Sequence, residues 1–186
     1  GYRARSVYKL TELDDTEHLF RPGMNVADLG SAPGSWTQIV RERLTDKNGE
    51  LKGRIIAMDI LPMEPIDGVT FLQGDFREQE VADKLNEILG GDKLDVVIRD
   101  RAPNLSGIAM VDANASLLLN ELALDFAVEH LKPEGVFVTK AFQGSGYSQF
   151  IENCKKHFVS VAQRKPEASR NSSAEMYVVA RRLKQK

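Results

Sequence analysis

"NVADLGSAPGSW", residues 25–36, joins a short apolar run to a helical pattern through a turn that contains Gly30, Pro33 and Gly34. A strand, such a turn and a helix form the first unit of an open, mostly parallel α/β sheet. Glycine permits the positive φ of a tight turn, and proline has the φ that the first turn of a helix requires. The stretch therefore predicts an α/β fold, with either a ligand-binding turn or a plain tight turn at this point.

Apolar runs continue this alternation along the chain, at residues 54–59, 69–73, 94–99 and 135–142. The segments between them are long enough for crossovers, and helices are expected at residues 34–44, 78–89, 115–131 and 148–157. Two more runs, residues 158–163 and 175–181, are joined only by a polar loop and predict a closing antiparallel hairpin at one edge. We therefore expect a mostly parallel seven-stranded sheet with helices on both faces.

A short helix is expected before the sheet, at about residues 6–20, because Ser6 can cap it and an apolar stripe follows. Val7, Leu10 and Leu13 form that stripe. The sheet core is expected at about residues 25–182, and we interpret the whole chain, 1–186, as a single domain.

The composition, 42% hydrophobic over 186 residues, is enough for one sizeable core. No apolar run approaches the roughly 20 residues that cross a bilayer, and no signal-like leader opens the chain. The single cysteine, Cys154, cannot form an internal disulfide, so we expect a packing role, a cytoplasmic location and no membrane partner. Residue 1 is Gly rather than Met, so we expect a natural N-terminal extension before it.

The formal net charge of −2 argues against a basic coat over the whole surface. Positive residues gather instead toward the two ends of the chain, at Arg3, Arg5, Arg164, Lys165 and Arg170. They are either solvated tails or a track for nucleic-acid phosphates, if the fold brings them together. The three histidines, His18, His130 and His157, lack metal-ligand spacing, so no metal site is expected.

Four carboxylates stand at the ends of predicted strands: Asp28, Asp59, Asp75 and Asp100. One such residue is usually a turn or a helix cap. The carboxyl ends of parallel strands, however, meet at one edge of a sheet, where the ligands of open α/β folds bind. The four acids together therefore predict a binding site.

The glycine turn differs from the G-x-G-x-x-G pattern of dinucleotide sites, and Pro33 lacks an N–H that could hold a phosphate. A ligand without phosphates is indicated. S-adenosylmethionine fits, because its adenosine needs acceptors and its cationic groups favour nearby carboxylates. Asp59 is placed for the ribose and Asp75 for the adenine, whereas Trp36 lies either against the cofactor or in the core.

Five motifs then stand in a specific order: "DLGSAPGSW" (28–36), "MDILPM" (58–63), "FLQGDFR" (71–77), "DRAPNLSG" (100–107) and "KAFQG" (140–144). They resemble the FtsJ/RrmJ family of ribosomal RNA 2′-O-ribose methyltransferases, over nearly the whole chain. The resemblance implies a Rossmann-like class I S-adenosylmethionine-dependent methyltransferase fold and a Lys-Asp-Lys-Glu tetrad. By matching motifs, the tetrad is Lys9, Asp100, Lys140 and Glu175. The implied cofactor-binding residues are Asp28, Gly30, Pro33, Gly34, Trp36, Asp59, Ile60, Asp75, Phe76 and Asp100.

The implied reaction explains why such a tetrad is needed. A ribose 2′-hydroxyl is a poor nucleophile, so the catalyst positions it in line with the methyl donor and removes its proton. Lys140 is the candidate, either as a base or as a protonated group that orients the hydroxyl; the charge of Lys9 favours the first and the two carboxylates favour the second. Asp100 would hold Lys140 and face the methyl donor, and Lys9 and Glu175 would position the hydroxyl and the lysines.

The chain departs from the family pattern at Arg99 and Arg101, where the family usually has Ser and Met, and at Ser35, where it has Gly. Arg101 is suited to bind a phosphate, to crowd the methionine part of the cofactor or to pair with Asp100. Arg99, in a strand expected to be buried, needs a polar partner or a route to solvent.

We expect a monomeric S-adenosylmethionine-dependent 2′-O-methyltransferase that modifies a ribose, by resemblance a uridine, in ribosomal RNA of the large subunit. The two arginines motivate the main alternative, a non-catalytic RNA-binding or ribosome-assembly factor with the same fold. A nicotinamide-dependent oxidoreductase is a weaker alternative, because the G-x-G-x-x-G pattern is missing.

Overall fold

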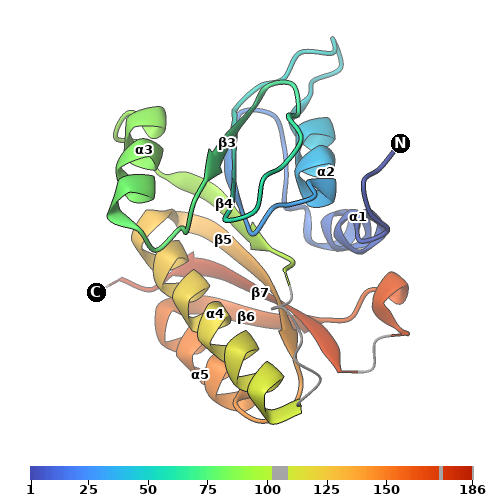
Figure 1. Ribbon diagram of the computed structural model, residues 1–186, viewed down its shortest axis with the longest axis vertical. Helices are drawn as coiled ribbons and strands as arrows, with labels where there is room; N and C mark the ends of the chain where they lie inside the picture. The colour runs from blue at the N-terminus through green and yellow to red at the C-terminus, as the bar shows by residue number, and fades with distance from the viewer. Residues whose placement is uncertain (102–108, 172–173, 186) are drawn as a thin grey trace.

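The computed structural model describes residues 1–101, 109–171 and 174–185 of the chain (Figure 1). The strands are β1 (Asn25–Leu29), β2 (Arg54–Asp59), β3 (Val69–Gln73), β4 (Leu94–Arg99), β5 (Leu131–Phe142), β6 (Phe158–Arg164) and β7 (Glu175–Leu183). The helices are α1 (Val7–Glu17), α2 (Ser35–Leu44), α3 (Gln79–Leu89), α4 (Ala109–His130), α5 (Tyr147–His157) and the short 3₁₀ helix η1 (Glu167–Ser169).

The strands form one seven-stranded sheet in the order β3-β2-β1-β4-β5-β7-β6. The neighbours from β3 to β5 pair in parallel, while β7 pairs antiparallel with both β5 and β6. The expected α/β fold with a mostly parallel sheet and an antiparallel hairpin is therefore confirmed. The hairpin does more than close the edge, because β7 inserts between β5 and the edge strand β6.

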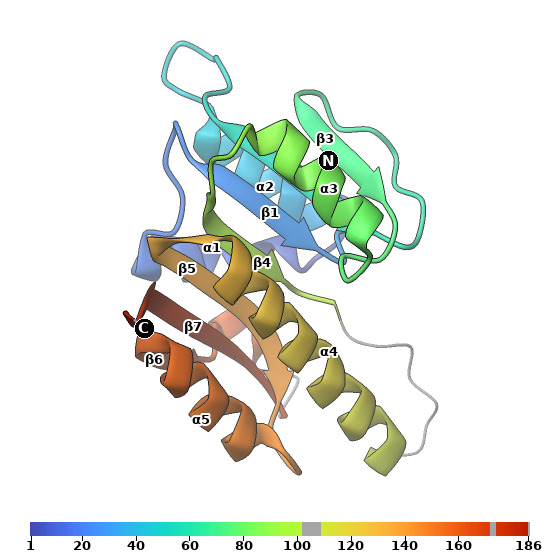
Figure 2. The same cartoon turned by 90° about the vertical axis from the view of Figure 1, so that its left-hand side faces the viewer.

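Helices cover both faces of the sheet. In Figure 2, α3, α4 and α5 lie on the face toward the viewer, and α1 and α2 lie behind the sheet. Each face has its own apolar core, because successive side chains of a strand point to opposite faces. Val97 of β4 belongs to the cluster under α3, α4 and α5, whereas Val96 and Ile98 pack with residues of α1 and α2.

Three local expectations were wrong. Helix α4 begins at Ala109, not near residue 115, and so is longer than its pattern indicated. Ser6 makes no capping bond with its side chain, because its Oγ instead lies 2.8 Å from Ser35 Oγ and ties α1 to α2. Pro33 precedes the first turn of α2 rather than lying in it, since Gly34 is the N-cap residue.

The turn between β1 and α2 depends on its two glycines. Gly30 has φ of +73° and Gly34 has φ of +114°, values that residues with a Cβ rarely adopt. The Gly30 amide donates to the Met58 carbonyl at 2.8 Å, which fastens the turn to the end of β2. The turn thus brings the tips of β1 and β2 and the start of α2 to one place.

Among the described residues, no helix has the length and apolar character needed to cross a membrane. The described residues also contain no group of three or more His, Cys, Asp or Glu side chains arranged to hold a metal ion.

Candidate active site

Two cavities open at the carboxyl ends of the parallel strands. The first, here called the β2–β3 cavity, has a volume of about 140 Å³ and is lined by Gly30, Met58, Asp59, Ile60, Gly74, Asp75, Phe76, Arg77, Arg99, Arg101 and Leu119. The second, the β1–α2 cavity, has a volume of about 300 Å³ and is lined by Ser6, Asp28, Gly30, Ser31, Ala32, Pro33, Ser35, Trp36, Asp100 and Arg101. Gly30 and Arg101 line both, so the two cavities adjoin.

The β2–β3 cavity contains the predicted acids of two strands. The carboxylate of Asp59 accepts backbone N–H groups from Ala32 at 2.8 Å and Leu61 at 2.9 Å, which fix its orientation. Asp75 is held by the guanidinium of Arg77, whose hydrogen bonds lower the pKa of Asp75. The Asp75 carboxylate therefore stays ionised at the cavity wall and can accept a hydrogen bond from a ligand.

The β1–α2 cavity contains Asp28, which is fully buried and accepts a hydrogen bond from Thr37 Oγ1 at 2.7 Å. Burial raises the pKa of Asp28 to about 7, although the Thr37 bond opposes the shift. Trp36 is both core and cavity wall, because its ring is stacked on Tyr177 with centroids 5.7 Å apart. Gly34, by contrast, is not in the lining of either cavity, and a Cβ there would lie 2.9 Å from Arg3 Nη1.

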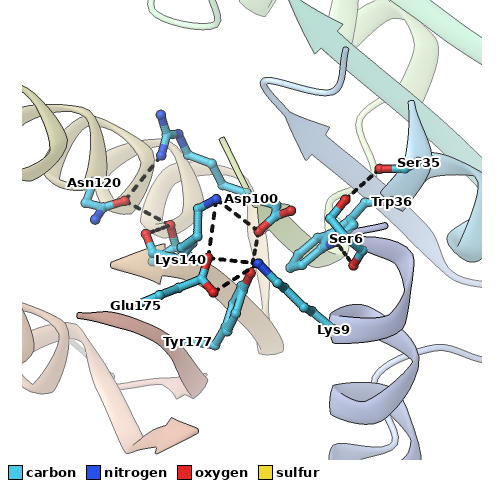
Figure 3. Close-up of polar contacts among 11 residues, drawn as sticks. Ser6, Lys9, Ser35, Trp36, Asp100, Asn120, Lys140, Glu175 and Tyr177 are labelled. Atoms are coloured by element: carbon cyan, nitrogen blue, oxygen red, sulfur yellow. Dashed lines mark hydrogen bonds and ion pairs between the residues drawn. The ribbon is translucent and has the colours of Figure 1, made fainter. Parts of the chain in front are cut away.

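The four residues of the implied tetrad come together beside this cavity, from α1, the end of β4, β5 and β7 (Figure 3). Lys140 Nζ lies 3.6 Å from Asp100 Oδ1 and 3.6 Å from Glu175 Oε1. Lys9 Nζ lies 3.0 Å from Glu175 Oε2. Two lysine amino groups and two carboxylates thus alternate in a cluster whose Asp100 side chain also lines the β1–α2 cavity.

Tyr177 is a member of this cluster that sequence reasoning missed. Its hydroxyl donates to Asp100 Oδ1 at 2.6 Å, and its ring is fully buried. The signal was available, because Tyr177 stands two residues after Glu175 in a strand and so shares its face. Burial raises the pKa of Asp100, while Lys140 and the Tyr177 hydrogen bond act in the opposite direction.

One of the expectations for Arg101, an ion pair with Asp100, was wrong. Its guanidinium forms an ion pair with Asp59 instead. Arg99 is 3% exposed and places Nη1 3.4 Å from Asn120 Oδ1, which also accepts a 2.9 Å bond from Thr139 Oγ1. Burial, with the like charge of Arg101 second, lowers the pKa of Arg99 to about 10. Most of the "DRAPNLSG" motif, residues 102–107, lies outside the described residues.

The basic residues near the chain ends are largely engaged with other groups. Arg3 donates to the carbonyls of Pro33 at 2.9 Å and Glu64 at 2.7 Å, so it ties the N-terminal segment to the mouth of the site. Arg164 pairs with Glu17 at 2.6 Å, which holds β6 beside α1. The chain ends themselves lie on opposite sides of the molecule (Figure 1).

Comparison with known proteins identifies close relatives. A family model described as FtsJ-like methyltransferase matches residues 2–183. Ribosomal RNA large subunit methyltransferase E of Bordetella petrii is 54% identical over 184 residues, which are 99% of this chain and 87% of that protein. The protein of the same name from Cupriavidus necator is 52% identical over 192 residues, with 99% and 87% covered.

Solved structures agree in fold. A ribosomal RNA methyltransferase from Plasmodium falciparum is 32% identical and superposes with a TM-score of 0.87, with 100% of both chains covered. The 1,6-didemethyltoxoflavin-N1-methyltransferase of Burkholderia thailandensis, solved with S-adenosylhomocysteine, has a TM-score of 0.56 at 17% identity, with 97% of this chain and 78% of that chain covered. The second likeness concerns the fold alone.

Proposed function

The chain belongs to the FtsJ-like methyltransferase family, and from this premise we propose that it methylates a ribose 2′-hydroxyl in ribosomal RNA of the large subunit. Its cofactor is S-adenosylmethionine, which supplies a methyl group on a positively charged sulfur. The relatives that are more than half identical act, by their names, on large-subunit ribosomal RNA. We transfer that substrate class to this chain and, by the family resemblance, a uridine as the modified nucleotide.

The residues at the strand ends fit this cofactor. In the β2–β3 cavity, Asp59 is suited to the ribose hydroxyls and Asp75 to the adenine amine, with Ile60 and Phe76 as apolar walls. In the β1–α2 cavity, Asp28 suits the ammonium group of the methionine part, since an ionised carboxylate attracts a cation. Ser31 Oγ is buried there without a hydrogen-bond partner among the described residues, which supports a polar ligand at this point.

One observation carries the proposal: Lys140 Nζ lies 3.6 Å from each of two carboxylates, and one of these, Asp100, lines the cavity suited to the methyl donor. Asp100 belongs both to this cluster and to that wall, so it connects the group that handles the acceptor with the donor. A nucleophile bound at Lys140 would therefore stand next to the cofactor, as an in-line transfer requires.

We assign roles to the cluster accordingly. Lys140 binds the 2′ oxygen, takes its proton if it is neutral, or stabilises the developing negative charge if it is an ammonium. Asp100 orients Lys140 and is itself oriented by Tyr177. Glu175 holds Lys9 and Lys140 together, so Lys9 supplies a second cation toward the acceptor. We further propose that the protein acts as a monomer on the assembled large subunit.

A non-catalytic RNA-binding factor is not favoured as an alternative. That alternative was based on Arg99 and Arg101, the residues at which the chain departs from the family pattern beside the tetrad. Neither arginine is bonded to a tetrad member among the described residues. The acidic and basic groups of the tetrad keep their mutual pairs.

The test is transfer of tritiated methyl groups from S-adenosylmethionine to undermethylated large ribosomal subunits. We expect transfer by the wild type, and a loss of about a hundredfold or more in Lys140→Ala, within the range by which general acid–base groups contribute. Lys132→Ala is the matched control on the same strand, since Lys132 pairs with Asp95 far from the site. Nuclease digestion of the product then identifies the labelled ribose and its base. Equal rates for Lys140→Ala and the wild type would overturn the assignment.

Lys140→Arg separates the two roles of Lys140. Arginine stays protonated, so it can orient the hydroxyl but cannot accept its proton. Retention of a substantial rate by Lys140→Arg would support the orienting role, whereas a loss equal to that of Lys140→Ala would support the base.

A further inference from the structure

Arg101 stands at the junction of the two cavities. It lines both of them, and its stem lies across the glycine turn, since a Cβ on Gly30 would be 2.9 Å from both Cβ and Cδ of Arg101. The guanidinium then reaches the carboxylate of Asp59 and forms an ion pair with Oδ2. The side chain of Asp59 is 1% exposed and that of Arg101 is 23% exposed, so the pair is mostly shielded from water.

This ion pair uses the acceptor sites that a ribose would need. Each carboxylate oxygen offers about two lone pairs. Asp59 Oδ1 already accepts the Leu61 N–H, and Oδ2 accepts the Ala32 N–H as well as Arg101. A ribose whose two hydroxyls bind one oxygen each therefore needs the site on Oδ2 that Arg101 occupies.

We propose that Arg101 is an intramolecular competitor for Asp59, so that adenosyl ligands bind only to molecules in which the Arg101–Asp59 ion pair is open. The inference rests on the proposed function, which assigns Asp59 to the ribose. The competition makes Arg101 an affinity-determining residue of this chain. The apparent dissociation constant is the intrinsic one divided by the open fraction.

The kinetic consequence is specific. A ligand that binds only while the ion pair is open associates more slowly, because only a fraction of the molecules can accept it. In the complex the ion pair is already broken, so it does not change the dissociation rate. Removal of Arg101 is therefore expected to raise the association rate constant and to leave the dissociation rate constant unchanged. If Arg101 contacted the cofactor instead, its removal would speed dissociation and weaken binding.

The experiment is stopped-flow binding of S-adenosylmethionine and S-adenosylhomocysteine to the full chain. The signal is the fluorescence of Trp36, the single tryptophan, which lines the β1–α2 cavity. In Arg101→Met we expect about fivefold tighter binding of both ligands, the effect of losing one partly buried ion pair, all of it in the association rate. Arg101→Gln provides a second variant without the charge, and Arg101→Lys is expected to fall between the wild type and Met.

Arg41→Met is the matched control. Arg41 also pairs with an aspartate, Asp67, and its guanidinium is outside both cavities, so ligand binding is expected to stay at the wild-type level. Unchanged or weaker binding in both Arg101→Met and Arg101→Gln would overturn the inference while leaving the proposed function intact. Absence of binding by the wild type and all variants would overturn both.

Discussion

Lys9 and Glu175, near opposite ends of the chain, form an ion pair in which Nζ lies 3.0 Å from Oε2. The pair joins α1 to the start of β7, and the Glu175 side chain is only 4% exposed. Because Glu175 also faces Lys140 at 3.6 Å, one buried carboxylate contacts the amino groups of two lysines from different elements. The first helix is thereby part of the site, not only a cover for the sheet.

Glu175→Gln is therefore expected to lower both stability and activity. The amide keeps the size of the side chain but leaves Lys9 and Lys140 facing each other without the shared charge, a buried defect that costs about 3 kcal/mol. Urea unfolding and methyl transfer measure the two effects. Glu152→Gln, which removes an exposed carboxylate paired with Lys155 on α5, is the control and is expected to change neither. A Glu175→Gln variant with wild-type stability would contradict the shared-carboxylate arrangement.

Tyr177→Phe is expected to act through Asp100. Removal of the hydroxyl takes away the 2.6 Å bond that fixes Asp100 Oδ1, at a cost of about 1 kcal/mol of stability. The rate of methyl transfer should fall about tenfold, with cofactor affinity nearly unchanged, because the tyrosine positions Asp100 without itself lining either cavity. Tyr147→Phe also loses a hydroxyl bond, to Gln163, and should retain the full rate. A rate drop shared by both variants would speak against a role at Asp100.

The sheet was predictable because each strand is marked by its own apolar run and bounded by turn residues. The beginning of α4 was not, since Asn114 is a favourable cap and the helix nevertheless starts at Ala109. The strand-end acids could be placed at one edge because parallel topology alone brings strand ends together. The Arg101–Asp59 pair could not be predicted, because the reach of a long side chain across the strand tips depends on its rotamer and not on its position in the sequence.

Asp28 is expected to make cofactor binding depend on pH. Its pKa of about 7 means that near neutrality the free protein holds a proton there in a large fraction of molecules. A cationic ligand favours the ionised form, so affinity for S-adenosylmethionine should rise between pH 6 and 8 and binding should release protons. Calorimetry in buffers of different ionisation enthalpy counts those protons. Asp28→Asn should bind more weakly and without this release; proton release that persists in the variant would locate the titrating group elsewhere.

Asp28 is expected to make the free energy of unfolding depend on pH in the opposite direction, falling as pH rises. The folded chain binds the Asp28 proton more tightly than the unfolded chain, whose aspartates titrate near pH 3.9. The stabilisation is complete below that value and is lost as pH rises through about 7, at up to about 1.4 kcal/mol per unit. Ligand-free Asp28→Asn should therefore gain stability relative to the wild type from pH 4 to 8 in urea titrations. A constant difference would show that Asp28 ionises alike in both states.

Arg99 places a cation in the interior of the protein. Its guanidinium has five N–H donors, yet among the described residues the contact to Asn120 at 3.4 Å is its one hydrogen bond. The lowered pKa, about 10, reflects the cost of keeping this charge away from water. Methionine fills a similar volume without that cost, so Arg99→Met should raise the free energy of unfolding by about 1 to 2 kcal/mol, measured in urea without cofactor.

The control for Arg99 is Arg54→Met. Arg54 Nη1 also makes one 3.4 Å contact, to the Leu89 carbonyl, but its side chain is exposed, so its charge stays hydrated and its replacement should change stability by less than about 0.5 kcal/mol. A loss of stability in Arg99→Met would mean that the guanidinium is well solvated within the β2–β3 cavity. Arg99 would then be a polar wall of the adenosine site, and its replacement should weaken cofactor binding in parallel.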